Sequence, residues 1–140
     1  MRRGDGRVGA VCCFVGTVRE VGGTEAVSAM ELEHYPGMTE AAIAQMIEEA
    51  RRRFEVLSST VIHRVGVLAP EDQIVLVAVT SPHRHDAFQA CEFLMDYLKT
   101  QAPFWKKETT PSGARWVDAR DSDDAALTRW GIQATNARNN

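Results

Sequence analysis

The sequence predicts an α+β domain with a mostly antiparallel sheet, two main helices and a short C-terminal helix. Apolar runs of strand length alternate with two longer segments whose apolar residues recur at helical spacing. Turn signals that contain glycine or proline separate these runs. The 140 residues fit one domain, which we expect over 1–131, followed by a polar tail over 132–140.

The first half of the chain predicts two strands and a helix. Residues 8–18 form an apolar strand, and residues 26–35 alternate so that Met30, Leu32 and His34 share the more apolar face. A Pro-Gly pair ends the second strand. Apolar residues at helical spacing then predict an amphipathic helix over about 40–55, with Thr39 as its cap.

The second half predicts further strands around a second helix. Strands are expected over 56–68 and 73–80, and the latter is apolar on both faces, which is typical of a central strand. Ser81 suits the N-cap and Pro82 the first turn of a helix that ends near residue 101. Short strands over 104–109 and 115–119 precede a last helix over about 122–130.

Composition excludes several classes of protein. An apolar fraction of 44% argues against a disordered chain, and no stretch approaches the roughly 20 apolar residues of a membrane span. The net charge of −3 argues against a broadly basic nucleic-acid binder. Three cysteines without a disulfide framework and the lack of a signal peptide predict a cytoplasmic protein. Phosphate-loop, dinucleotide and Cys-x-x-Cys motifs are absent from the sequence.

Cationic residues near the second helix are the main candidates for function. His83 and Arg84 lie in its first turn, where free N–H groups already favour an anion; exposed solvated residues remain the alternative. Lys99 lies at the other end, where a cation also suits the helix dipole. His83 and His85 point to different faces of a helix, so we expect no metal site.

Two more cationic positions flank predicted strands. Arg19 follows the first strand, and it is either a ligand-binding residue or an ordinary edge charge. Lys106 follows Phe104 and Trp105 in a short strand, where the aromatic residues could wall a pocket. The three cysteines lie in apolar stretches and favour buried packing over a catalytic thiol.

Helix length restricts how these cations can combine. Arg84 and Lys99 are 15 residues apart, which is about 22 Å along a helix. Either the protomer has two sites, or one site is built across a subunit interface from the start of one helix and the end of another. The second alternative predicts a homodimer.

Six motifs together resemble the large, catalytic subunit of molybdopterin synthase. The resemblance runs from about residue 9 to residue 130, although the segment before Gly9 is shorter than is usual in that family. The motifs are 14–19 (FVGTVR), 32–40 (LEHYPGMTE), 62–66 (IHRVG), 81–84 (SPHR), 95–100 (MDYLKT) and 102–108 (APFWKKE).

This resemblance implies an α/β hammerhead fold and a sulfurtransferase. The family converts cyclic pyranopterin monophosphate (precursor Z) to molybdopterin. The sulfur comes from the C-terminal thiocarboxylate of a small ubiquitin-like carrier subunit. Two large subunits form a central dimer in a heterotetramer. We therefore expect these partners, a pterin phosphate substrate, no resident cofactor, no nucleic acid and no membrane.

The resemblance also implies the site residues. Lys99 and Lys106 are the expected catalytic residues, and neighbouring cations and partial desolvation should lower the pKa of Lys99. Thr17 stands where many relatives have lysine, so one cation of the pocket is absent here. Substrate binding is expected from Thr17, Val18, Arg19, His83, Arg84, Lys99, Lys106, Lys107 and Glu108.

Two alternatives compete with this interpretation. A non-catalytic dimeric scaffold could bind the ubiquitin-like carrier, but it would not need Lys99 and Lys106. A nucleic-acid-binding module could use the Arg51–Arg53 run with Lys106 and Lys107, which the net charge disfavours. The arginine run is also explained as a solvated helix face.

Overall fold

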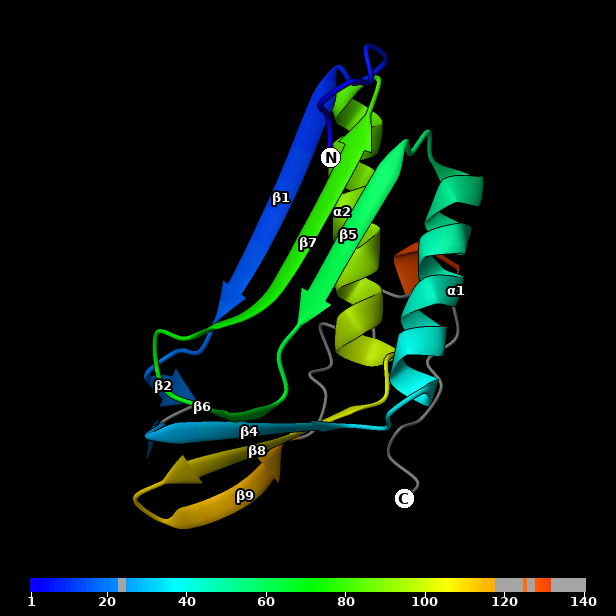
Figure 1. Ribbon diagram of the computed structural model, residues 1–140. Coiled ribbons are helices and arrows are strands. Elements are labelled where there is room, and N and C mark those ends of the chain that lie inside the picture. Colours follow the sequence, from blue (N-terminus) through cyan, green and yellow to red (C-terminus); the bar gives the residue numbers. More distant parts are fainter. Residues whose placement is uncertain (23–24, 118–124, 126–127, 132–140) are drawn as a thin grey trace.

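Two larger antiparallel sheets, a two-stranded hairpin and two long helices make up the described part of the molecule (Figure 1). The structure is a computed structural model, and it describes residues 1–22, 25–117, 125 and 128–131. The expected α+β class with mostly antiparallel strands is confirmed. None of the helices in these ranges is long and apolar enough to cross a membrane.

The first sheet has three strands in the order β1-β7-β5. They are β1 (Ala10–Thr17), β7 (Gln73–Ser81) and β5 (Ser58–His63), and both pairings with β7 are antiparallel. The prediction that β7 is central is confirmed. Val77 and Val79 have no exposed surface, because a strand with neighbours on both edges and a helix on one face is shielded from water.

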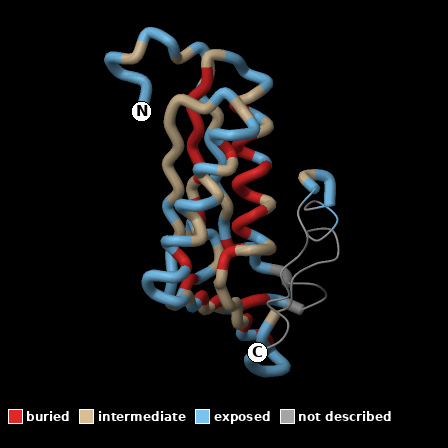
Figure 2. Tube along the Cα trace, turned by 90° about the vertical axis from the view of Figure 1, so that its right-hand side faces the viewer, coloured by how far each residue is buried: buried red, intermediate tan, exposed pale blue. Residues whose placement is uncertain are grey.

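Two helices cover one face of this sheet, and the buried core lies between (Figure 2). The helices are α1 (Met38–Arg53) and α2 (Arg84–Thr100). Phe93 and Leu94 of α2 are almost fully buried against β7. Phe93 also makes an edge-to-face contact with Phe54 at 5.8 Å between ring centroids.

The second sheet has four strands in the order β6-β4-β8-β9 and crosses the lower end of the first sheet (Figure 1). Its strands are β6 (Gly66–Leu68), β4 (Ala29–His34), β8 (Phe104–Thr110) and β9 (Gly113–Val117). A short hairpin of β2 (Val21–Gly22) and β3 (Glu25–Ala26) lies beside it.

The single strand expected over 56–68 is wrong. The structure divides this segment into β5, in the three-stranded sheet, and β6, in the four-stranded sheet. The chain turns between them at Gly66, whose φ of 90° is a conformation that glycine adopts without steric cost. The division matters because it carries the chain from one sheet to the other beside His63.

The expected helix caps are also wrong. α1 begins after Gly37, whose N–H donates to the Glu40 carboxylate at 2.6 Å. The Thr39 hydroxyl instead donates to the Pro103 carbonyl at 3.1 Å and so ties α1 to the start of β8. Ser81 ends β7, and the N-cap of α2 is His83. The helix expected over 122–130 lies mostly outside the described residues, as does the tail over 132–140.

Candidate active site

A corner forms where the end of the three-stranded sheet meets the four-stranded sheet. Val18, Met30, Leu32 and Leu68 are buried there and pack together as a small core. The predicted apolar face of the second strand is confirmed, because Met30 and Leu32 are the residues of β4 that join this core. Arg19 directly follows Val18 and is exposed, so its side chain leaves the chain at this corner.

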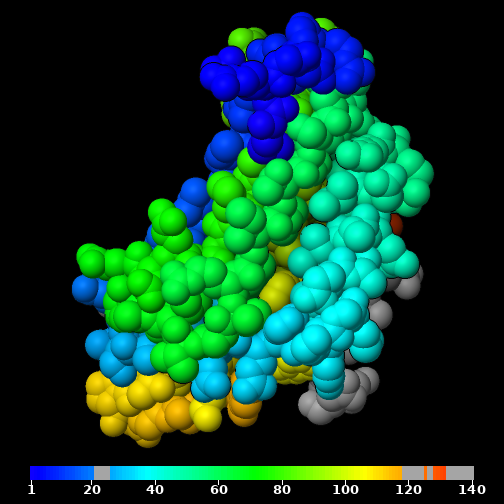
Figure 3. All heavy atoms as spheres, viewed as in Figure 1, coloured from blue at the N-terminus to red at the C-terminus, as the bar shows by residue number. Residues whose placement is uncertain are grey.

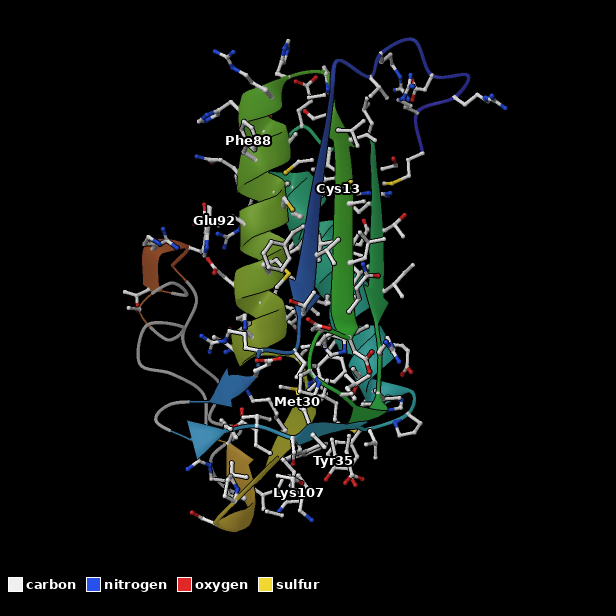
Figure 4. The ribbon with its side chains drawn as sticks, turned by 90° about the vertical axis from the view of Figure 1, so that its left-hand side faces the viewer. Cys13, Met30, Tyr35, Phe88, Glu92 and Lys107 are labelled. Carbon is white, nitrogen blue, oxygen red and sulfur yellow. The ribbon has the colours of Figure 1, made fainter. Side chains whose placement is uncertain are left out.

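Strand alternation sorts the charged residues of β8 onto two faces. Lys106 pairs with Leu32, and Glu108 with Met30, so both share the face that contacts the small core. We call this the inner face of the four-stranded sheet. Lys107 pairs with Glu31 and lies on the outer face. Figure 4 shows Met30 and Lys107 on opposite sides of the sheet.

An ion network occupies the inner face. The Glu108 side chain is only 9% exposed, and its carboxylate oxygens lie 3.7 Å from Lys106 Nζ and 3.8 Å from Arg115 Nη2. Arg115 is the register partner of Glu108 on β9. Two cations therefore face one buried carboxylate.

Lys99 reaches the same corner from the last turn of α2. It is exposed, and its positive charge makes a small contribution to lowering the pKa of His63. His63 stacks on Phe104 with a centroid distance of 3.9 Å and an interplanar angle of 19°. Phe104 lies on the same face of β8 as Lys106, so the stack places His63 beside the inner face.

His63 is neutral at neutral pH for identifiable reasons. Burial lowers its pKa, and the charges of His34 and Lys99 lower it further. Nδ1 lies 2.8 Å from the Arg64 carbonyl, and this contact acts in the opposite direction. Because a carbonyl only accepts, Nδ1 carries the proton and Nε2 keeps a lone pair.

His83 and Arg84 lie at the opposite end of α2. Both are exposed, and His83 Nε2 is 4.0 Å from the Glu55 carboxylate. The 17 residues of α2 span about 25 Å. One protomer therefore does not bring His83 and Arg84 to Lys99, as the spacing in the sequence predicts.

Three of the expected binding residues take other positions. The Val18 side chain is in the small core, its N–H donates to the Asp72 carbonyl, and its carbonyl accepts from Glu71, so it fixes where Arg19 leaves the strand. Thr17 is exposed at the end of β1. Lys107 is separated from Lys106 by the pleat of β8, and we leave it out of the proposed pocket.

Two further residues of the corner are not singled out by the sequence alone. His63 belongs to the 62–66 motif. The sequence feature that could have indicated a functional role is a histidine at the end of an apolar strand. Arg115 could be found only through the β8–β9 register, which places it opposite Glu108. A turn at 111–112 sets that register, and residue spacing does not reveal it.

The cysteines do not offer a thiolate at this corner. Burial is the main reason that the pKa of Cys91 is raised to about 12, and Cys12 beside it contributes in the same direction. Cys13 is exposed on the other side of the three-stranded sheet (Figure 4). A sulfur nucleophile from Cys91 is therefore disfavoured, which agrees with the packing interpretation of the sequence for that residue. For Cys13, which is exposed, the expectation of burial is wrong.

The arginine run on α1 is a solvated helix face. Arg52 and Arg53 both pair with Glu49, and Arg51 pairs with Glu48. A surface hollow of about 670 Å³ lies over these residues and Tyr97. Its cations are balanced by carboxylates on the same helix.

Fold and corner together define an α+β protein with a group of cations on its four-stranded sheet. The family model of the MoaE protein matches residues 1–101. The molybdopterin synthase catalytic subunit of Ralstonia nicotianae is 61% identical over 137 residues, which cover 98% of this chain and 78% of the relative. The chain therefore belongs to the MoaE family, whose members include molybdopterin synthase catalytic subunits, enzymes of molybdenum-cofactor biosynthesis.

Solved structures agree. The molybdopterin biosynthesis MoaE protein from Burkholderia ambifaria superposes with a TM-score of 0.78 at 60% identity, covering 94% of this chain and 86% of that one. A protein–protein complex of subunits 1 and 2 of molybdopterin-converting factor from Helicobacter pylori has a TM-score of 0.67. That match covers 81% of this chain and 75% of the other at 20% identity, so it shows the fold alone.

Proposed function

We propose that this chain transfers sulfur to precursor Z and so forms molybdopterin. The proposal is supported by the match to the MoaE family and by the positions of three cations: Lys99 is in the last turn of α2, Lys106 is on the inner face of β8, and Arg19 follows Val18 of the small core. A pterin phosphate is an anion, and lysine and arginine bind such groups through charge-assisted hydrogen bonds.

Each cation has a separate role in this proposal. Lys99 acts on the carrier's C-terminal carbonyl, either by proton transfer or by transient covalent bonding. Lys106 stabilises negative charge, either on the reacting oxygen or on the phosphate of the substrate, and Glu108 holds it in place. Arg19 contributes a charge from the end of β1.

The sulfur donor in the proposal is a small ubiquitin-like subunit with a C-terminal thiocarboxylate. The high pKa of Cys91 supports an external donor, because a neutral buried thiol is a poor nucleophile. The Helicobacter pylori neighbour is a complex of two subunits of molybdopterin-converting factor, which supports a two-subunit enzyme for the same fold. The proposed assembly is a heterotetramer around a dimer of this chain.

The central dimer is proposed to form through the side of the three-stranded sheet that faces away from α2. We call this the outer face of that sheet. Its exposed apolar residues are Val11, Val15 and Ile62 (47%, 45% and 55% exposed), and Cys13 lies between them. The viewer looks onto this side in Figure 3, where only the N-terminal segment crosses its upper end among the described residues.

A dimer with antiparallel helices completes the proposed site. In an antiparallel dimer through this face, the end of one copy that carries His83 and Arg84 lies next to the end of the other copy that carries Lys99 and Lys106, so both groups of cations contribute to one site. This arrangement reconciles the length of α2 with one composite site, which a single protomer does not form.

Reconstitution tests the proposed reaction. The protein is mixed with precursor Z and a thiocarboxylated carrier subunit, and molybdopterin is measured by its oxidised fluorescent derivative. We expect product from the wild type and a loss of at least about 100-fold in kcat for Lys99→Ala. The matched control is Arg51→Ala, which removes an exposed cation of α1 and should retain wild-type activity.

The outcomes separate the two candidate functions. Carrier binding by Lys99→Ala, measured by titration calorimetry, should stay within about threefold of wild type. Wild-type protein that binds the carrier yet forms no molybdopterin would indicate the scaffold alternative. Conversion by Lys99→Ala at the wild-type rate would remove the assignment of Lys99.

A further inference from the structure

We propose that Arg115 is a further substrate-binding residue, and that Arg115 and Lys106 together bind the phosphate of the pterin substrate. Glu108 serves in this arrangement as the shared counter-ion that positions both cations. The inference rests on the proposed function and adds a specific binding role to a residue that the six motifs leave out.

The register of the four-stranded sheet places the three side chains together. Glu108 is directly opposite Arg115, and Lys106 is directly opposite Val117. Arg115 is therefore the diagonal neighbour of Lys106 on the inner face, at a backbone separation of about 7–8 Å. Two long side chains at this spacing can reach one phosphate group between them.

The contacts with Glu108 position both cations. Its carboxylate lies 3.7 Å from Lys106 and 3.8 Å from Arg115, beyond the 2.7–2.9 Å typical of a charge-assisted hydrogen bond. A buried carboxylate attracts both cations at these distances and restricts where they lie.

Exposure separates the roles of the three residues. The Glu108 side chain is 9% exposed, whereas Lys106 and Arg115 are 33% and 50% exposed. The carboxylate thus lies beneath the two cations, and the cations form the surface that a ligand meets. A guanidinium presents a planar fork that matches phosphate oxygens, whereas an ammonium acts as a point charge.

Steady-state kinetics with the carrier and precursor Z test the proposal. Arg115→Ala should raise KM for precursor Z by about ten- to hundredfold and change kcat by less than about threefold. KM for the carrier should not change. Arg115→Lys should recover part of the affinity, since it keeps the charge and loses the fork.

Inorganic phosphate gives a second readout, which a structural role of Arg115 does not predict. Phosphate should inhibit the wild type competitively with precursor Z, and its inhibition constant should weaken in Arg115→Ala. Arg51→Ala is the matched control for loss of an exposed arginine and should behave as wild type. Thermal unfolding checks that each variant is folded, and Arg115→Gln replaces Arg115→Ala if the alanine variant is not.

The possible outcomes are distinct. A folded variant with unchanged KM and unchanged phosphate inhibition would overturn the role of Arg115. A change confined to KM for the carrier would overturn the assignment to the pterin phosphate, because the anion bound would then be the carrier's carboxyl end. An inactive wild type would count against the proposed function itself, since every comparison starts from an active enzyme.

Discussion

The two sheets use the same antiparallel pairing for different purposes. The three-stranded sheet is apolar on both faces: its inner side packs on α2, and its outer face exposes Val11, Val15 and Ile62. The four-stranded sheet carries Lys106, Glu108 and Arg115 on its inner face. In the proposed enzyme, stability and subunit contact depend on the three-stranded sheet, and ligand binding depends on the charges of the four-stranded sheet.

The largest effect is expected when two inactive variants are mixed. This experiment tests whether the start of α2 in one subunit and the end of α2 in the other contribute to the same site. Lys99→Ala and the double variant His83→Ala/Arg84→Ala should each be inactive alone. After unfolding and refolding together, half of the dimers contain one of each chain, and each of these has one intact composite site. We expect about a quarter of wild-type activity to return. No recovery from a mixture shown to contain mixed dimers would contradict a site shared between subunits.

Removing Phe93, the largest fully buried side chain among the described residues, should lower the stability of the fold. Phe93 is 1% exposed and contacts Phe54 and the ring of Trp130 at 5.5 Å. Phe93→Ala should lower the free energy of unfolding by about 3–5 kcal/mol through lost burial and a residual cavity. Urea denaturation followed by circular dichroism measures this. Phe88→Ala, which removes a 61% exposed ring from the same helix, is the control and should cost far less.

A charge on the outer face of the three-stranded sheet should weaken the dimer. Ile62 is 55% exposed, so Ile62→Lys buries little new charge in the isolated protomer. In the proposed dimer both copies place this lysine in the apolar interface, and the dissociation constant should increase by about ten- to hundredfold. Analytical ultracentrifugation measures the constant. Val67→Lys, at a 72% exposed site on β6, should leave it unchanged.

His63, which lies where the two sheets meet, should make the free energy of unfolding depend on pH. Burial lowers the pKa of His63 below its ordinary value of 6.5, with smaller contributions in the same direction from His34 and Lys99. The unfolded chain then binds the proton more readily than the folded one. The stability gained from neutral His63 is present above pH 6.5 and is lost as the pH falls towards the folded pKa.

Urea midpoints at pH 8 and pH 5.5 measure this effect. The wild type should lose more stability on acidification than His63→Gln. His85→Gln removes an exposed histidine and should keep the wild-type dependence. An identical pH dependence in wild type and His63→Gln would show that another group controls acid stability.

The sequence predicts the apolar sheet better than the charged one. The run of valines in β7 and the helical spacing of Phe93 and Leu94 depend on local pattern, which the structure confirms. The separation of β5 from β6 depends on a turn at Gly66 and on which strand each part pairs with. Pairing is a long-range property, so residue spacing does not reveal it.

The candidate site shows the same limit. Helix length alone indicates that Arg84 and Lys99 are far apart, and the structure agrees. The grouping of Lys106 with Lys107 in one motif conceals that alternate residues of a strand point to opposite faces. Arg115 joins the corner only through the register of β9 with β8.

The smallest predicted effect distinguishes the two faces of β8. Lys107 lies on the outer face with its ammonium 5.7 Å from the centroid of the Trp116 ring, which is 57% exposed. A cation–π contact at such an exposed site contributes about 0.5–1 kcal/mol to stability. Lys107→Ala should therefore lower stability by about that amount and leave kcat and KM within about twofold of wild type, whereas Lys106→Ala should lower kcat/KM by at least about 100-fold. A loss of activity in Lys107→Ala as large as that in Lys106→Ala would mean that the substrate contacts the outer face, and the division of the four-stranded sheet into a reactive inner face and a solvated outer face would be wrong.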